Sequence, residues 1–245
     1  MILTVLVGNT NTRFAWFNGR RLAKFLILPT PVVRGGRLPR PDRVAGVAVA
    51  SVVAEVTNAV IERLRSSTGL EPLVVGPCTR TGLRFNYLRE ELGADRVCVA
   101  VGATCSLPGR DVIVFDFGTA TTVNVILREG TFAGGAILPG VQMSLDCLAA
   151  GTAGLPKLVP GRKLGPVQRT TRTAIQAGVS ALYAGGIDHI VSQVERGLRR
   201  RFLVVATGGA ASIARQYGRR IRSVRPRLAS EGLGEIWYRN HCPQE

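Results

Sequence analysis

The sequence predicts an α/β protein built from two related lobes around a central cleft. Apolar, strand-like runs alternate with helical stretches along the chain, which is the order expected of sheets covered by helices. Residues 5–12 also resemble residues 115–122, because in both an apolar strand ends at a glycine that hydroxyl and amide side chains follow. A repeat of this kind predicts two similar lobes, which we place at residues 1–108 and 109–245.

Hydrophobic patterning places the elements of the first lobe in order. Short apolar runs predict strands at residues 3–7, 13–17, 21–28, 44–53 and 72–75. Val56, Val60 and Leu64 share one face of a predicted helix over residues 55–68, and Gly69 provides its stop. Residues 29–43 are rich in Pro, Gly and Arg, which predicts an exposed loop.

The second lobe follows the same logic. Apolar runs predict strands at residues 111–115, 121–127, 130–137 and 202–206. Helical spacing predicts helices over residues 141–150 and 173–198, the second of which tolerates Gly185 and Gly186. Residues 154–169 are rich in Pro and Gly and predict a loop between them.

Composition limits the classes of partner. The formal net charge is +16, with arginine concentrated in residues 196–227, and such a surface can bind phosphates of nucleic acid. Aromatic side chains are not interleaved there in the pattern that base stacking uses, so we expect a solvated surface and no nucleic-acid partner. No apolar run reaches 18 residues and the start lacks the pattern of a signal peptide, which predicts a cytoplasmic protein without a membrane span.

Three glycine turns follow buried strands and predict a nucleotide site. A glycine lets the backbone approach a phosphate, and the N–H groups of the turn donate to it. Residues 8–10 and 118–121 would therefore clamp a polyphosphate, while residues 207–209 offer flat backbone for a nucleoside. The P-loop pattern and the dinucleotide G-x-G-x-x-G opening are both missing from the sequence.

Two acidic residues are candidates for phosphoryl-transfer chemistry, which needs a base for the attacking hydroxyl and carboxylates for the metal. Asp116 lies in the second glycine turn, and Asp95 precedes a small apolar run. Asp95 is either that base or an ordinary helix cap, and the residues leave both open. Arg96 beside it has the planar guanidinium that suits an anionic ligand.

With these residues in place, the chain resembles the type III pantothenate kinases, which share the fold of acetate and sugar kinases, Hsp70 and actin. The resemblance extends over nearly the whole chain. It is carried by residues 8–10 of a D-x-G-N-T motif, by the G-x-D-R motif at residues 93–96, and by residues 116–122, 134–140, 152–156, 174–178 and 206–209.

The resemblance implies RNase H-like lobes and ATP-dependent phosphorylation of pantothenate to 4′-phosphopantothenate, the first step towards coenzyme A, by a homodimer. It implies Asp95 as general base, and Asp116 as the ligand of a monovalent cation, potassium or ammonium, alongside ATP and Mg²⁺. The implied ATP contacts are Leu6, Val7, Gly8, Asn9, Thr10, Asn11, Thr12, Arg13, Thr119, Thr121, Gly208 and Gly209. The implied pantothenate contacts are Asn86, Tyr87, Gly93, Ala94, Asp95, Arg96 and Thr171.

The sequence also departs from the family at the expected site. Leu6 stands where the family has its first Asp, and the internal repeat shows the same gap because Leu6 aligns with Asp116. The family's Tyr before the substrate motif falls near Asn86, its Asn-Pro pair falls on residues 88–89, and an acid often found after the second phosphate motif is Asn124. Weakened kinase activity, a non-catalytic binding or transcription-accessory role, and a different hydroxyl substrate therefore stay open.

Overall fold

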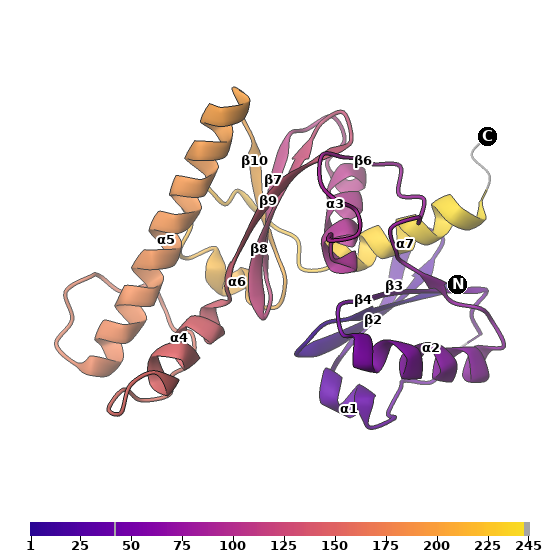
Figure 1. Cartoon of the computed structure of the whole chain (residues 1–245), viewed down its shortest axis with the longest axis horizontal. Helices are drawn as coiled ribbons and strands as arrows, with labels where there is room; N and C mark the ends of the chain where they lie inside the picture. The colour runs from indigo at the N-terminus through magenta and orange to yellow at the C-terminus, as the bar shows by residue number, and fades with distance from the viewer. Residues whose placement is uncertain (42, 243–245) are drawn as a thin grey trace. The chain divides into compact units, whose positions relative to one another are not determined.

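The computed structural model describes residues 1–41 and 43–242, which form two compact units (Figure 1). Unit 1 consists of residues 1–108, 129–132 and the chain from 227 onward. Unit 2 consists of residues 109–128 and 133–226. The sequence-based division into 1–108 and 109–245 did not anticipate that the chain returns twice to unit 1.

The sheet of unit 1 has the strand order β3-β2-β1-β4-β5. Its strands are β1 (Ile2–Val7), β2 (Asn11–Asn18), β3 (Arg21–Pro29), β4 (Gly46–Ser51) and β5 (Leu73–Val74). β1 lies in the centre, antiparallel to β2 and parallel to β4. All six residues of β1 are buried, as expected of a strand covered on both faces.

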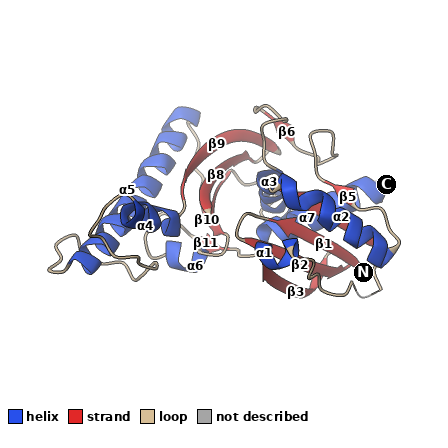
Figure 2. Cartoon of the chain, turned by 60° about the horizontal axis from the view of Figure 1, so that its bottom comes forward, coloured by secondary structure: helices blue, strands red, loops and turns tan. Residues whose placement is uncertain are grey.

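Helices cover both faces of this sheet (Figure 2). Helices α1 (Thr30–Arg34) and α2 (Ala54–Thr68) pack on the face that carries Leu3, Val5 and Val7. Helices α3 (Ala94–Ser106) and α7 (Leu228–His241) cover the other face, where Ile2 meets residues of α7. The predicted loop over 29–43 is wrong at α1, whose first turn accepts a proline.

Close packing of α3 on α7 depends on two glycines. A Cβ at Gly232 would lie 1.9 Å from the carbonyl oxygen of Cys98, and one at Gly102 would lie 2.2 Å from that of Leu228. Any side chain at these positions would therefore force the two helices apart. The C-terminal helix was not predicted from the sequence, and this contact is what attaches it to unit 1.

Unit 2 repeats the topology of unit 1. Its strands are β7 (Val112–Phe117), β8 (Ala120–Leu127), β9 (Thr131–Pro139), β10 (Leu203–Thr207) and β11 (Ser223–Val224), of which the first two residues of β9 belong to unit 1. The second sheet has the order β11-β10-β7-β8-β9-β6, in which β6 (Arg84–Phe85) pairs with Thr131 and Phe132. Apart from β6, this order read from β9 to β11 matches β3-β2-β1-β4-β5 strand for strand. The prediction of two related α/β lobes is confirmed.

Helices of unit 2 complete its core. These are α4 (Val141–Ala150), α5 (Thr171–Leu198) and α6 (Ala211–Ala214). Tyr183, Ile187 and Val191 of α5 belong to one cluster with Phe115 and Phe117 of β7. Among the described residues, no helix is long and apolar enough to cross a membrane.

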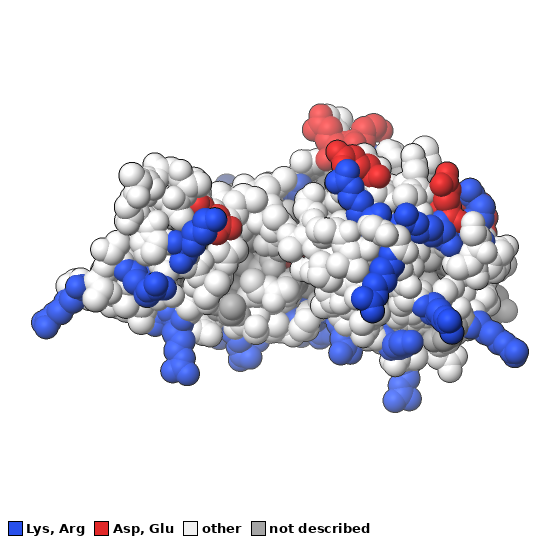
Figure 3. All heavy atoms as spheres, turned by 90° about the horizontal axis from the view of Figure 1, so that it is seen from below, with Lys and Arg blue, Asp and Glu red and all other residues white. Residues whose placement is uncertain are grey.

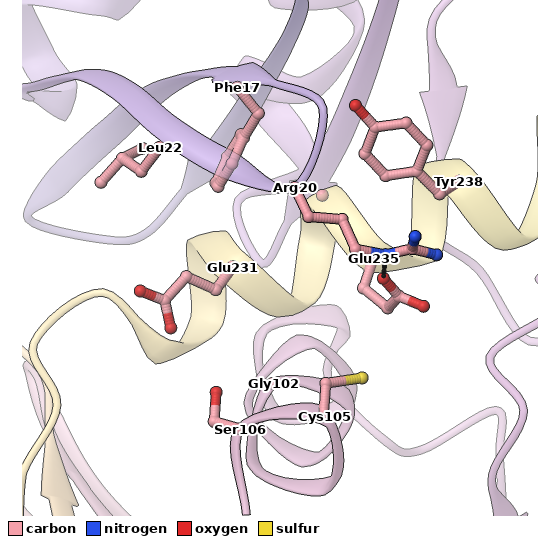
Figure 4. Close-up of a pocket in the computed structure, with 10 residues that line it drawn as sticks. Phe17, Arg20, Leu22, Gly102, Cys105, Ser106, Glu231, Glu235 and Tyr238 are labelled. Atoms are coloured by element: carbon pink, nitrogen blue, oxygen red, sulfur yellow. Dashed lines mark hydrogen bonds and ion pairs between the residues drawn. The ribbon is translucent and has the colours of Figure 1, made fainter.

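An ion-pair network fixes α7 to the β2–β3 hairpin in unit 1. Glu235 of α7 accepts hydrogen bonds from the Nε atoms of Arg20, at 2.8 Å, and Arg239, at 3.1 Å. The pair of Arg20 and Glu235 borders a small pocket walled by Phe17 and Leu22 (Figure 4). Burial raises the pKa of Glu235, but the hydrogen bonds and charges of both arginines outweigh it, so the net pKa lies below its ordinary value.

We expect this network to make the fold sensitive to acid. Because the folded-state pKa of Glu235 is depressed, its contribution is present above the unfolded-state pKa and is lost as the pH falls through the folded one. Glu235→Gln should cost about 1–2 kcal/mol at pH 7 and progressively less below pH 4.5, measured as Tm against pH. The control Glu71→Gln removes an exposed pair with Arg65 and should change little. A Tm loss for Glu235→Gln that is the same at pH 3.5 and pH 7 would contradict this assignment.

Candidate functional site

The first glycine turn joins β1 to β2 and is held by a threonine from α1. Gly8 N–H donates to the Asn11 carbonyl at 3.1 Å, and the Thr30 hydroxyl donates to the Gly8 carbonyl at 2.6 Å. The Thr30 N–H donates to the Thr10 carbonyl at 2.9 Å. Asn9 and Thr10 are exposed, so the turn presents its tip to solvent. Sequence reasoning missed Thr30 because it lies in the segment assigned to a loop.

Leu6 is buried just before this turn. Its side chain is 2% exposed, and its Cα is paired with Arg13 of β2 and Ala50 of β4. Side chains alternate along a strand, so Leu6 lies on the face opposite Val5 and Val7, which pack against α2. The end of β1 thus offers apolar bulk where the aligned position of the other unit, Asp116, offers a carboxylate.

Asp95 lies in the first turn of α3, which begins after Gly93. Its Oδ1 accepts a hydrogen bond from the Arg96 N–H at 2.8 Å. Burial raises the pKa of the Asp95 carboxyl, and the hydrogen bond and charge of Arg96 and the charge of Arg13 oppose this without cancelling it. The N-cap is Gly93, so Asp95 satisfies one free amide of the first turn and is also a carboxyl with raised proton affinity, as a general base needs.

Arg96 is held between two aromatic rings. It is 5% exposed, and its guanidinium carbon lies 5.4 Å from the ring centroid of Tyr87 and 5.4 Å from that of Phe132. The Asn86 N–H donates to the Phe132 carbonyl at 2.9 Å. The structure therefore brings the predicted substrate contacts Asn86, Tyr87 and Arg96 together, around a phenylalanine that sequence reasoning did not single out.

A cavity of about 320 Å³ opens beside the start of α3. Gly93 and Ala94 line it, together with Ser51, Gly76 and Arg89. The Arg89 guanidinium donates to the carbonyls of Gly76 at 3.0 Å and Pro77 at 3.2 Å. The volume suits a small ligand. Gly93 and Ala94 of the predicted substrate motif form part of its wall, whereas Asp95 and Arg96 are not among the residues that line it.

The second glycine turn and the third lie together in unit 2. Asp116 at the end of β7 is in register with Thr122 of β8 and Thr207 of β10. Gly208 has φ +93°, and a Cβ there would lie 2.3 Å from Asp116 Oδ1. A side chain at position 208 would therefore collide with the carboxylate of Asp116. Residues 116–121 and 207–209 lie close together and form one cluster.

Two further features belong to this cluster: the support of the turn at Thr119 and the buried polar side chains of β8. A Cβ at Gly140 would lie 2.0 Å from the Thr119 carbonyl, so the turn that carries Thr119 rests on a glycine. Thr121 Oγ1 is buried and has no hydrogen-bond partner among the described residues. Asn124 is fully buried and its Nδ2 donates to the Thr122 hydroxyl at 3.2 Å.

Thr171 lies elsewhere in unit 2, at the start of α5. It lines an apolar groove of about 510 Å³ with Leu148 of α4 and Ile175 and Leu182 of α5. The predicted sites therefore separate by unit. Unit 1 carries residues 6–13, 86–87 and 93–96, whereas unit 2 carries Asp116, Thr119, Thr121, Gly208, Gly209 and Thr171.

Comparison with known proteins gives a consistent result. The model of the type III pantothenate kinase family matches residues 2–193. A type III pantothenate kinase of Syntrophotalea carbinolica is 37% identical over 254 residues, covering 98% of this chain and 99% of the relative. The Geobacter sulfurreducens enzyme of the same name is 35% identical over 255 residues, with 98% and 99% covered.

Solved structures show the same fold. A Baf family transcriptional activator from Campylobacter jejuni superposes with a TM-score of 0.66 at 18% identity, covering 97% of this chain and 98% of the other. An activator of 2-hydroxyisocaproyl-CoA dehydratase from Clostridium difficile gives 0.52 at 12% identity, with 98% and 94% covered. At these identities the likeness concerns the fold alone, which is the actin-like ATPase fold that the sequence predicts.

Proposed function

The chain belongs to the type III pantothenate kinase family, and from this premise we propose that it transfers the γ-phosphoryl group of ATP to pantothenate. The product is 4′-phosphopantothenate, and the reaction is the first step of coenzyme A biosynthesis. The observation that carries the proposal is the folded G-x-D-R motif, in which Asp95 has a raised pKa and Gly93 and Ala94 line a cavity of suitable size.

In this mechanism Asp95 accepts the proton of the pantothenate hydroxyl as that oxygen attacks the γ-phosphorus, and ADP leaves in line. Burial raises the pKa of Asp95, which favours acceptance of the proton, while the charges of Arg13 and Arg96 act in the opposite direction and favour the ionised form. Arg96 donates to oxygen acceptors of the substrate through its guanidinium. Asn86, Tyr87, Gly93 and Ala94 surround the substrate.

The two glycine turns are proposed to hold the phosphates of ATP. The proposed contacts are the backbone N–H groups of residues 6–13, together with Thr119, Thr121, Gly208 and Gly209. Asp116 is the proposed ligand of potassium or ammonium. The bare backbone of Gly208 and the buried Thr121 hydroxyl without a partner among the described residues fit oxygen ligation there.

Mg²⁺ when bound with ATP neutralises the charge that develops on the transferring phosphoryl group. The donor set of this chain fits such an ion only in part, because Leu6 provides no side-chain oxygen near the end of β1. We therefore propose that the metal depends mainly on the phosphates and on water, with weakened turnover as the consequence.

The direct test is an assay with purified protein, ATP, Mg²⁺, potassium and labelled pantothenate, in which phosphopantothenate is separated and counted. Pantothenate-dependent product is the expected result. Omitting potassium should lower the rate if Asp116 holds the monovalent cation. Complete absence of product at millimolar substrates would remove the kinase assignment.

A second candidate function is a non-catalytic relative that binds nucleotide or pantothenate, or acts as a regulator. The buried Leu6 favours it, because the first phosphate motif lacks its acid. Calorimetry separates the two functions: binding of ATP and pantothenate without any product supports the second.

We propose that the protein is a homodimer and that the apolar groove along α4 and α5 lies in its interface. Leu182 is 68% exposed and Leu148 is 37% exposed in this groove, and continuous apolar surface of this kind marks association sites. In that arrangement Thr171 of one protomer reaches the substrate of the other.

Light scattering should give the mass of a dimer at micromolar concentration, and Leu182→Lys should give a monomer because it buries a charge in the interface. The control is Leu198→Lys at the far end of α5, where Leu198 is 42% exposed outside the groove. A monomeric native protein, or a dimer insensitive to Leu182→Lys, contradicts the proposal.

We propose a cytoplasmic location and no nucleic-acid partner. Lys and Arg side chains are scattered over the face shown in Figure 3 and do not form one continuous patch. Binding through phosphates would fall steeply with salt. A sub-micromolar, salt-sensitive complex with duplex or single-stranded DNA would overturn this part of the proposal.

A further inference from the structure

We propose that Phe132, together with Tyr87, is a positioning residue that aims the Arg96 guanidinium at the substrate. The inference rests on the proposed function, since it assumes that Arg96 binds pantothenate. Phe132 belongs to none of the motifs that carry the family resemblance, and it enters the site from β9, far along the chain from the G-x-D-R segment.

The geometry leaves the guanidinium little freedom. Its carbon lies 5.4 Å from each ring centroid, within the range of a cation–π contact. The rings of Tyr87 and Phe132 meet edge to face, with centroids 5.8 Å apart and an interplanar angle of 86°. Two mutually perpendicular rings against one planar cation restrict both its position and its tilt.

Burial makes these contacts matter. Phe132 is 0% exposed and Arg96 is 5% exposed, and a cation–π contact is strongest where the cation is desolvated. A guanidinium has five N–H donors in a fixed fork, and because the two rings are perpendicular its plane can lie parallel to at most one of them. The two rings together therefore restrict the direction in which that fork points.

Backbone pairing places Phe132 at this point. Residues 131–132 of β9 pair in parallel with β6, in the register Phe85 to Phe132. The Asn86 N–H then donates to the Phe132 carbonyl at 2.9 Å. The segment that carries Tyr87 is thus hydrogen-bonded directly to the strand that carries Phe132. The pairing of β6 with β9 therefore fixes the positions of both rings.

Phe85 provides a matched control within the same aromatic cluster. Its ring centroid lies 6.1 Å from that of Phe132, but its own cation–π partner is Arg89, at 4.2 Å. Phe85→Leu therefore removes a ring of equal size from the cluster without removing a contact to Arg96.

The experiment measures the KM for pantothenate, the KM for ATP and kcat of Phe132→Leu, Tyr87→Leu, Tyr87→Phe and Phe85→Leu, with the Tm of each. Phe132→Leu and Tyr87→Leu should raise the KM for pantothenate about tenfold, the loss expected from one desolvated cation–π contact, with the KM for ATP unchanged. Tyr87→Phe keeps the ring and should therefore raise the KM for pantothenate less than Tyr87→Leu does. Phe85→Leu should also lower the Tm, by less than Phe132→Leu because Phe85 is only half-buried, but should leave the KM for pantothenate unchanged.

The outcomes separate this inference from the proposed function. If the native protein neither binds nor phosphorylates pantothenate, the proposed function is wrong, and so is the proposed positioning role of Phe132 and Tyr87. If the native protein is active, and Phe132→Leu and Tyr87→Leu lower the Tm without changing the KM for pantothenate, the two rings stabilise the fold and do not position Arg96. If Phe132→Leu does not fold, Tyr87→Leu against Tyr87→Phe decides. If the native protein binds without turnover, the Kd for pantothenate replaces the KM.

Discussion

Asp95→Asn is expected to lower the rate of pantothenate phosphorylation by about 10²- to 10⁴-fold, the usual cost of losing a general base. The amide cannot accept the proton of the attacking hydroxyl. The amide oxygen still accepts the Arg96 N–H, so α3 keeps the hydrogen bond that Oδ1 now makes at 2.8 Å. The measurement is single-turnover product formation at saturating ATP and pantothenate.

Stability separates the base from a mere helix cap. Burial raises the folded-state pKa of Asp95, so its ionised form is disfavoured and its stabilising contribution, present below the unfolded-state pKa, is lost as the pH rises through the folded one. Asp95→Asn should therefore leave the Tm at pH 7 unchanged or raised. A residue that serves only as a cap would leave the rate unchanged in Asp95→Asn, and would show its cost of about 1 kcal/mol only in Asp95→Ala.

The pH dependence adds a second signature. kcat/KM of the native protein should fall as the pH drops through the raised pKa of Asp95, because the protonated acid accepts nothing further. In Asp95→Asn the residual rate should be flat over the same range. The control Glu55→Gln alters the exposed acid in the first turn of α2 and should preserve both the rate and its pH profile.

The fold was predictable from the sequence wherever the signal was local. The repeat at residues 5–12 and 115–122 correctly indicated two related lobes, because strand, glycine and hydroxyl residues recur in order. The C-terminal helix was not predicted. Gly232 and Gly234 weaken the helical pattern there, yet Gly232 is needed for contact with the carbonyl of Cys98 in α3. That requirement is visible only once the two helices are packed together.

The residues of the candidate site also differ in how far the sequence could predict them. Asp95, Arg96 and Asp116 stand in short motifs, so their neighbourhood could be named from the sequence. Phe132 could not, because its role arises from the pairing of β9 with β6, strands separated by more than forty residues. Thr30 holds the first glycine turn from a segment with no motif at all.

Leu6→Asp is expected to raise the rate of phosphoryl transfer by about 10²-fold, the scale of one charge-stabilising group at a reacting centre. The carboxylate would stand near the end of β1, directly opposite Arg13 of β2. It would hold Mg²⁺ through water, because this ion gives up its waters reluctantly. The native protein should correspondingly turn over well below the ordinary kinase range of about 1–100 s⁻¹.

The same substitution carries a structural cost that serves as an internal control. Leu6 is 2% exposed, so replacing it removes about 1.5–3 kcal/mol of apolar burial and introduces a charge. Leu6→Asp should lower the Tm of the free protein and recover part of it with ATP and Mg²⁺. Leu6→Asn, which has the same size and no charge, should lose Tm as well but gain neither rate nor metal-dependent stabilisation.

Three results would bear against this account of Leu6. Native turnover within the ordinary kinase range shows that another group holds the metal. Equal rates for Leu6→Asp and Leu6→Asn show that a carboxylate at the end of β1 has no role in the reaction. A folded Leu6→Asp protein that binds Mg²⁺ and ATP but gains no rate moves the defect to residues 86–89 or to the buried Asn124, where the chain also departs from its family, and strengthens the non-catalytic reading.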